Sequence, residues 1–424
     1  MQNHADSTKP KKVERNVNLL LISQFLTGIT SMTVQYAIMW YLTEQTHSAT
    51  TLSIATLIGM LPMIVLSPFA GTIVDRYNKK VLLIAPDVVA ALVAGGLSLY
   101  LHQTSAQATY LIFAVLFIRA VAQTFQMPTL QSIIPTITPE DKLTRVNGRF
   151  SVIQSVNMIL APALGAFLFG IISIEYLLLL DILGAFFGIL ILRYVNIPSN
   201  QTTGEKQSVK QAFIDMRTGF QLLRSKTGLW ITLLIGAVGT LFVMPTATLY
   251  PLMTTNFFKL TVADAGIVEV LYSVGMLSGG LIISLFGKWK NRMIPFVLSY
   301  VILGATFLLS GLLPANFTGF IWFNILAALS GISVPFFETI LNSMIQQSYE
   351  AKDLGKVMGA TLSVLSLPGP IGLIVIGPLG DSIGLTTVFI IAGIAILLCV
   401  PINLAFKSAR NYDINLQKSI KNID

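Results

Sequence analysis

The sequence is poor in charged residues and in cysteine. Aspartate, glutamate, lysine and arginine make up 11% of the 424 residues, less than half of the roughly 25% typical of soluble proteins. Apolar residues make up 54%, and the mean hydropathy is +0.75. This composition excludes a soluble globular protein and indicates a polytopic membrane protein. The only cysteine is Cys399, so no disulfide can form within the chain.

The motifs of several enzyme classes are also missing. The sequence contains no GxxxxGK[ST] phosphate loop, no HExxH and no pair of cysteines. ATP hydrolysis and metal chemistry therefore have no residues to carry them. We expect a protein that is not an enzyme and that holds neither a metal ion nor a bound cofactor.

The sequence does contain apolar runs of about 20 residues, which is long enough to cross the hydrocarbon core of a bilayer. Their number predicts an all-α membrane protein with twelve transmembrane helices. The runs lie near 17–41, 51–74, 81–101, 108–127, 147–172, 175–195, 229–253, 264–287, 293–313, 317–338, 357–379 and 385–406.

A basic leader precedes the first run. That run is longer than the roughly 7–15 apolar residues of a signal peptide, and no small-residue cleavage site follows it, so we interpret it as a retained helix. With the N-terminus inside, twenty-five of the 27 lysines and arginines fall on one side or in the termini. Cytoplasmic loops accumulate these residues, which predicts cytoplasmic termini in a bacterial-type plasma membrane. The net charge of +8 then contacts lipid headgroups and not nucleic acid.

A polar connector divides the chain in the middle. Its second part has apolar residues at helical spacing, which predicts an amphipathic helix in the membrane interface, with a regulatory docking site as the alternative. Short segments recur across it at an offset of 212 positions, such as Lys79–Val81 and Asn291–Met293. This repeat predicts two parallel six-helix bundles with substrate held between them. The predicted parts are a leader (1–16), an N-terminal bundle (17–195), the connector (196–228), a C-terminal bundle (229–406) and a tail (407–424).

The ten residues GTIVDRYNKK lie between the second and third runs. They resemble the loop 2-3 signature of the major facilitator superfamily, Gly-x-x-x-Asp-Arg-x-Gly followed by two bases. Asn78 stands in place of the second glycine, and asparagine tolerates the left-handed backbone of such a turn. The resemblance covers essentially the whole chain and implies the major facilitator fold. The matching residues are Gly71, Asp75, Arg76, Lys79 and Lys80.

This loop has the residue types of a gate. Asp75 can face the positive N-terminal end of a neighbouring helix, and the resemblance supplies span eleven, which begins near Val357, as that neighbour. Alternating access requires a contact of this kind that breaks in the other conformation. The alternative is that the charges only mark the end of a span. The matching place in the second half, GKWKNR at 287–292, keeps its bases but has no acid.

Two further stretches are similar to exporters of this superfamily. Residues 127–148 resemble the macrolide-efflux and siderophore-exporter branch. The sequence Ala-Pro-Ala-Leu-Gly-Ala at 161–166 resembles the exporter motif of span five, Gly-Pro-x-x-Gly-Gly, with alanine at two glycine positions. Small residues allow helices to approach closely. The resemblance therefore implies close helix packing at Ala161, Pro162 and Gly165.

Ionisable residues well inside apolar runs are costly and usually functional, and five residues are singled out on this ground. Asp87 and Arg119 lie at similar depths, roughly 10 Å from the cytoplasmic side at 1.5 Å per residue, so they are able to pair. A carboxylate in a low-dielectric cavity is suited to carry a proton. The proton-coupling candidates are Asp87, Glu269, Asp181 and Glu338, with Arg119 as the modulating charge. A fixed ion pair is the alternative for Asp87 with Arg119, and a place near the outer headgroups is the alternative for Asp181.

A polar stripe along span one predicts part of a substrate cavity, because such a stripe faces water or protein instead of lipid. The resemblance adds spans four, seven and ten to the cavity wall. Methionine and aromatic residues adapt to varied apolar shapes, so this lining suits a large amphiphilic molecule better than a sugar. Helix packing is the alternative for each residue. The candidates are Gln24, Thr27, Ser31, Gln35, Tyr36, Gln123, Thr240, Met244, Thr248 and Asn324.

These features together predict a secondary transporter. We expect drug/proton antiport, in which amphiphilic small molecules such as macrolide-like antibiotics leave the cell by alternating access. The proton gradient supplies the energy, and the partners are the lipid bilayer, the substrate and protons, with the protein acting as a monomer. The alternatives are a proton-coupled uptake symporter of the same fold, and a lipid flippase or non-transporting sensor.

Overall fold

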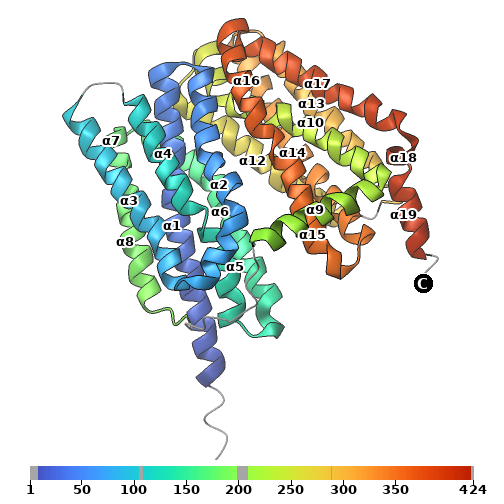
Figure 1. Ribbon diagram of the computed structural model, residues 1–424. Coiled ribbons are helices and arrows are strands. Elements are labelled where there is room, and N and C mark those ends of the chain that lie inside the picture. The colour runs from blue at the N-terminus through green and yellow to red at the C-terminus, as the bar shows by residue number, and fades with distance from the viewer. Residues whose placement is uncertain (1–7, 105–107, 198–208, 288, 422–424) are drawn as a thin grey trace, which may run out of the picture. The chain divides into compact units, whose positions relative to one another are not determined.

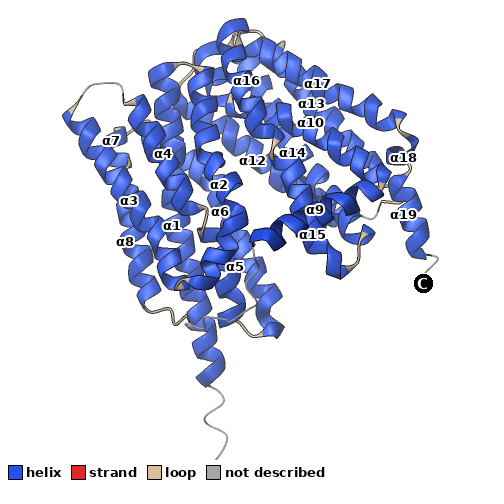
Figure 2. Ribbon diagram, viewed as in Figure 1, coloured by secondary structure: helices blue, strands red, loops and turns tan. Residues whose placement is uncertain are grey.

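The computed structural model describes residues 8–104, 108–197, 209–287 and 289–421. Within these ranges every regular element is helical, and short loops join the helices (Figures 1 and 2). Twelve helical segments of the described chain are long and apolar enough to cross a membrane. The predicted number of spans and the all-α class are thereby confirmed.

The elements fall into two compact units, Met1–Gln45 with Ile58–Gln207 and Thr46–Leu57 with Ser208–Asp424. The division near residue 207 lies in the predicted connector. Thr46–Leu57 departs from the predicted boundaries, because the first turns of α2 group with the second unit.

The helices before the connector are α1 (Thr8–Thr46), α2 (Ala49–Arg76), α3 (Lys79–Gln103), α4 (Thr109–Gln123), α5 (Gln126–Ile137), the 3₁₀ turn Glu140–Lys142, α6 (Leu143–Phe169), α7 (Ile174–Leu177) and α8 (Leu180–Arg193). Those that follow are α9 (Val209–Ser225), α10 (Thr227–Thr248), α11 (Tyr250–Leu252), the π-helical turn Met253–Phe257, α12 (Val262–Phe286), α13 (Met293–Gly311), α14 (Phe317–Ser348), α15 (Ala351–Ser366), α16 (Pro368–Ile383), α17 (Leu385–Ala405), α18 (Lys407–Arg410) and α19 (Tyr412–Lys421).

Two of the spans are interrupted near a proline. Span four consists of α4 and α5, and Pro128 near the start of α5 has no N–H to donate to the carbonyl four residues earlier. Span eleven consists of α15 and α16, and Pro368 is the first residue of α16. The first interruption lies between Arg119 of α4 and Gln126 of α5.

The connector contains the predicted helix, α9, which packs against α15 of the second unit (Figure 1). Lys356 of α15 forms an ion pair with Asp215 of α9 at 3.6 Å. The hydroxyl of Tyr349 donates to the carbonyl of Leu222 at 3.0 Å. The connector helix is therefore held by the second unit through protein contacts.

An apolar core fills one end of the first unit. It joins residues of α1, α3, α5, α6 and α8 with Val195 just after α8, and its members are less than a tenth exposed. The polar cluster described below is formed by residues of α1, α3, α4, α5 and α8. The core consists of Val17, Leu20, Leu21, Leu83, Leu130, Ile133, Ile134, Ile137, Val146, Leu192 and Val195.

Candidate functional site

A buried arginine joins three helices of the first unit. Arg119 of α4 is 1% exposed, and its Nη1 pairs with Oδ2 of Asp181 on α8. Its Nη2 donates to the carbonyl and to Oγ of Ser31 on α1, at 3.1 and 3.0 Å. A buried charge is tolerated when it has partners of this kind. The guanidinium therefore fixes α1, α4 and α8 at one point.

Gln123 extends this cluster towards the surface of the unit. It lies one turn after Arg119 on α4, and its Nε2 donates to Oγ of Ser31 at 3.1 Å. The Gln123 side chain itself is exposed. Two of the predicted cavity residues, Ser31 and Gln123, thus meet beside the predicted modulating charge, Arg119.

A second carboxylate lies near this cluster without a cation. Asp87 of α3 is 8% exposed, and its Oδ1 accepts a hydrogen bond from Nε2 of Gln126 on α5 at 3.2 Å. Its Oδ2 is buried and has no hydrogen-bond partner in the described part of the chain. Asp87 and Asp181 are close enough to interact electrostatically, and Thr27 of α1 lies beside Asp87. The cluster therefore holds two carboxylates and one guanidinium.

The partner of Arg119 differs from the one that similar depth suggested. The structure pairs Arg119 with Asp181 and not with Asp87. Asp181 is 3% exposed, so protein encloses its side chain. The reason is the contact between α8 and α1, where a Cβ on Gly184 would overlap the Thr30 side chain. This close approach brings Asp181 to the interior of the unit.

The other span-one candidates are mostly enclosed by protein. Gln24 and Thr27 are 6% and 3% exposed, whereas Gln35 and Tyr36 are half-buried. A Cβ on Gly165 of α6 would lie 3.0 Å from Cβ of Tyr36, so α6 approaches α1 closely at this glycine. Ala161 and Pro162 of the same predicted packing motif are also buried. Gln24 and Thr27 therefore face the interior of the first unit.

The second-unit cavity candidates use their polar groups within their own helices. Thr240 and Thr248 donate to the carbonyls of Ala237 and Met244, at 2.9 and 3.1 Å. Asn324 is 8% exposed and donates from Nδ2 to the carbonyl of Phe320 at 2.9 Å. The sulfur of Met244 lies against Gly369.

The two acidic candidates of the second unit lie in different places. Glu338 is exposed and, with Thr240 and Tyr300, lines a cavity of about 130 Å³. Glu269 is half-buried on α12, one turn before Tyr272, whose ring lies 6.2 Å from that of Tyr250. Neither glutamate has an ion-pair partner in the described residues.

Two lysines of the loop 2-3 motif hold neighbouring segments of the first unit. Lys80 donates to the carbonyls of Arg193 and Val195, at 3.2 and 3.0 Å, and Lys79 donates to the carbonyl of Ser132 at 3.4 Å. Gly71 and the side chains of Asp75 and Arg76 lie outside the part of the chain that the structure describes. The gating role of Asp75 therefore stays a prediction.

Asn78 adopts a different role from the expected left-handed turn. Its φ is −61° and its ψ is 115°, an extended conformation, and its side chain accepts hydrogen bonds from the backbone N–H groups of Lys80 and Val81. Asparagine is a preferred N-cap residue. The expectation of a left-handed turn is wrong, because Asn78 caps α3 instead.

Asp381 is a functional candidate that the sequence interpretation missed. Its carboxylate, at the end of α16, accepts hydrogen bonds from Oγ of Ser48 at 2.7 Å and from the backbone N–H groups of Ala49 and Thr50 at 2.6 and 3.0 Å. A Cβ on Gly380 would lie 2.9 Å from Cβ of Ala49. The carboxylate therefore caps the first turn of α2 and holds it against α16, favoured by the positive end of the helix dipole.

The sequence profile of the Major Facilitator Superfamily matches residues 20–373 and 246–419. The chain belongs to the major facilitator superfamily. This membership confirms the family inferred from GTIVDRYNKK, and it makes the protein a multi-pass membrane transporter and not an enzyme.

Known members of the superfamily resemble this chain over most of its length. Macrolide efflux protein A of Streptococcus pyogenes is 34% identical over 381 residues, which cover 89% of this chain and 92% of that protein. Multidrug efflux pump Tap of Mycolicibacterium fortuitum is 21% identical over 406 residues, covering 93% and 97%. A solved POT family transporter in complex with a thioalcohol conjugated peptide has a TM-score of 0.71 at 15% identity, covering 92% of this chain and 96% of that one. Its likeness shows the major facilitator fold alone.

The missed residues of this major facilitator transporter had weak local signals. Gln126 is one of several amides in span four, and nothing in the sequence distinguishes it from the others. It bonds to Asp87 from the first residue of α5, after the interruption of the span. Asp381 follows two glycines, Gly377 and Gly380, at the end of span eleven. A carboxylate after small residues near the end of a span is the signal that was available.

Proposed function

We propose that this transporter exports amphiphilic small molecules, macrolide-like antibiotics first among them, in exchange for protons. The similarity to Macrolide efflux protein A over 89% of the chain carries the direction and the cargo class. The similarity to a multidrug efflux pump supports export of varied compounds. The protein acts as a monomer in a bacterial-type plasma membrane, with both termini in the cytoplasm, as the distribution of lysine and arginine supports.

Proton coupling rests on the charge balance of the cluster in the first unit. Arg119 compensates one carboxylate, Asp181. Asp87 has an amide partner and no cation among the described residues. A buried charge without a counter-charge costs several kcal/mol, so a proton is the simplest group to neutralise Asp87. We assign Asp87 the proton-carrying role and Arg119 the role of modulating it.

A macrolide-like cargo fits a lining of amides, hydroxyls and methionine. Ser31 and Gln123 offer polar groups at the edge of the cluster. Ser31 accepts from Arg119, which holds Asp181, and Gln123 donates to Ser31. Cargo that displaced Gln123 from Ser31 would change the surroundings of Arg119. Because Arg119 modulates Asp87 in this proposal, such a change gives cargo and proton a route to influence one another.

The contact of Asp381 with the start of α2 supports alternating access. It ties α16 to the turns of α2 that group with the second unit, whereas the rest of α2 groups with the first. A switching transporter needs contacts that hold one state and break in the other. We assign this contact to the extracellular side of the membrane, where α16 ends and α2 begins.

We expect Asp381→Ala to release the start of α2. Hydrogen bonds to a charged group contribute about 1.5–3 kcal/mol each, so the loss should shift the balance of states by roughly tenfold or more. Efflux should fall, and a cysteine replacing buried Ser53, in a Cys399→Ser background, should react faster with an impermeant maleimide added outside. The matched control is Asp264→Ala, which removes the capping box of α12. Equal labelling in both variants would rule out this role.

A growth-inhibition panel tests the proposed function. Cells with and without the protein are challenged with chemically diverse antibiotics, and we expect raised tolerance to macrolides and to other amphiphilic drugs. Increased sensitivity or greater accumulation would favour the uptake symporter. Unchanged growth and unchanged drug accumulation across the panel would favour a lipid flippase or a sensor.

A further inference from the structure

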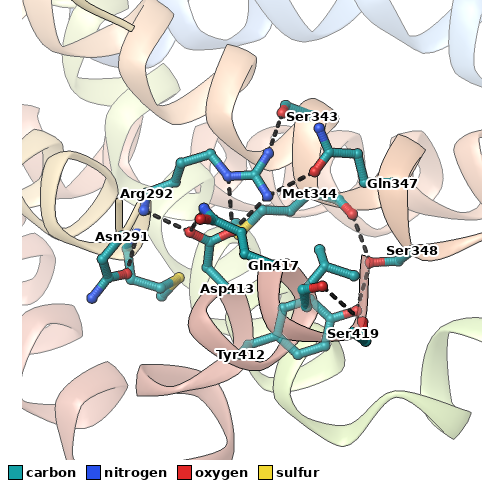
Figure 3. A network of polar contacts seen from close by, with 12 residues as sticks. Asn291, Arg292, Ser343, Met344, Gln347, Ser348, Tyr412, Asp413, Gln417 and Ser419 are labelled. Atoms are coloured by element: carbon teal, nitrogen blue, oxygen red, sulfur yellow. Dashed lines mark hydrogen bonds and ion pairs between the residues drawn. The ribbon is translucent and has the colours of Figure 1, made fainter. Parts of the chain in front are cut away.

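The C-terminal helix α19 supplies a carboxylate to the start of α13. Asp413 is fully buried, and its Oδ2 accepts a hydrogen bond from the backbone N–H of Arg292 at 2.6 Å. Its Oδ1 lies 2.8 Å from Nε and 2.6 Å from Nη2 of the same arginine. Figure 3 shows the two side chains facing one another, with Gln417 also donating to Asp413 at 2.9 Å. The arginine and the carboxylate thus form a close, buried pair.

The guanidinium of Arg292 also contacts a third helix, α14. Its Nη1 donates to Oγ of Ser343 at 2.6 Å, and its Nη2 donates to Oε1 of Gln347 at 2.9 Å (Figure 3). Both acceptors lie in the last turns of α14. A cation near the C-terminal end of a helix is also favoured by the helix dipole. Arg292 therefore ties α13 to α14, and Asp413 fixes its orientation.

Other contacts hold α18 and α19 in place. Oγ of Ser348 and the hydroxyl of Tyr412 lie 2.7 Å apart. Burial raises the pKa of the Tyr412 hydroxyl. Gly228, at the start of α10, lies against the carbonyl of Ser408 and the ring of Tyr412, where a Cβ would overlap both. The tail therefore contacts the ends of α10, α13 and α14 together.

The first half of the chain has an equivalent arrangement made from other groups. Lys80 and Arg292 occupy matching positions of the repeat. Lys80 holds the segment that leaves the sixth span through the carbonyls of Arg193 and Val195. Arg292 holds the segment that leaves the twelfth span through Asp413. A base at the matching position thus holds the segment that leaves each bundle, Lys80 through backbone carbonyls and Arg292 through the carboxylate of Asp413.

We propose that α19 is a working part of the second bundle, in which Asp413 supplies the carboxylate that loop 287–292 lacks and positions Arg292 to tie α13 to α14. The acid missing from the second-half loop is supplied from 121 residues further along the chain. Asp413 is a positioning residue, since it acts through Arg292. The movement of α14, which carries Glu338 and Asn324, then depends on the tail.

The test uses the full chain with four variants. They are Asp413→Asn, Arg292→Gln, the exchanged pair Arg292→Asp with Asp413→Arg, and the control Lys418→Gln, an exposed charge on the same helix. Because charge-assisted hydrogen bonds are lost, Asp413→Asn should lower the maximal macrolide efflux rate by about tenfold. The KM should stay near that of the wild type, since no cargo contact changes. The exchanged pair should recover part of the rate, and Lys418→Gln should match the wild type.

Thermal unfolding of the purified proteins in detergent gives a second readout that needs no cargo. We expect the effects of Asp413→Asn and Arg292→Gln on the unfolding midpoint to be non-additive, because the two residues contact one another. Wild-type efflux from Asp413→Asn, or an exchanged pair no better than the single variants in efflux and unfolding, overturns the proposal. If the wild type exports no macrolide, additive midpoint shifts overturn it independently of the proposed function.

Discussion

Arg119→Met will strongly destabilise the protein. The substitution leaves Asp181 as an uncompensated buried carboxylate and removes two hydrogen bonds from Ser31. Removal of one partner of a buried ion pair costs about 3–5 kcal/mol. We expect chemical denaturation of the purified protein in detergent to show a loss of this size. Efflux should be lost with it.

The double variant Arg119→Met with Asp181→Leu separates stability from transport. An apolar pair of similar volume often restores the stability of a buried ion pair, so we expect most of the unfolding free energy to return. Transport should not return, because the cluster then lacks the charge that modulates Asp87. The ion pair would be purely structural if the double variant exported macrolides at the wild-type rate.

Asp87→Asn will uncouple efflux from the proton gradient. The amide has nearly the shape of the carboxylate and can still bond to Gln126, but it does not titrate near neutral pH. We expect gradient-driven transport in everted vesicles to fall to the level of vesicles without the protein. Exchange of labelled for unlabelled macrolide across the same membrane should continue, because it requires no net proton movement.

Glu269→Gln is the matched comparison for Asp87→Asn. Glu269 is a half-buried carboxylate of the second unit that has no ion-pair partner in the described residues. We expect its substitution to slow efflux while leaving ligand binding measurable and the proton dependence intact. Gradient-driven accumulation by Asp87→Asn, together with its loss in Glu269→Gln, would move the proton site to the second unit.

The sequence was sufficient to predict the fold because the relevant signals are local. A span requires about 20 apolar residues, and the superfamily signature lies within the ten residues of GTIVDRYNKK. Helical spacing selected Ser31, the spans expected around the cavity selected Gln123, and a charge inside span four selected Arg119, but the meeting of these three residues was not predicted. These predictions did not depend on the rotational orientation of each helix about its own axis.

The contacts of the site could not be predicted because they depend on helix rotation and on distant segments. Depth along a span placed Asp87 level with Arg119, but it did not show which face of α3 carries Asp87. The close approach of α8 to α1 at Gly184 places Asp181 against Arg119. Asp413 lies 121 residues from Arg292, with no local pattern that links them. Packing therefore decides which charges are compensated.

Labelled macrolide uptake by everted membrane vesicles tests the central claim most directly. In such vesicles the exporter moves its cargo into the lumen, and an acidic lumen reproduces the physiological proton gradient. Proton-driven export predicts accumulation of macrolide above its external concentration and collapse of that accumulation when a protonophore is added. Accumulation no greater than in vesicles without the protein, or accumulation that the protonophore leaves unchanged, would contradict the account.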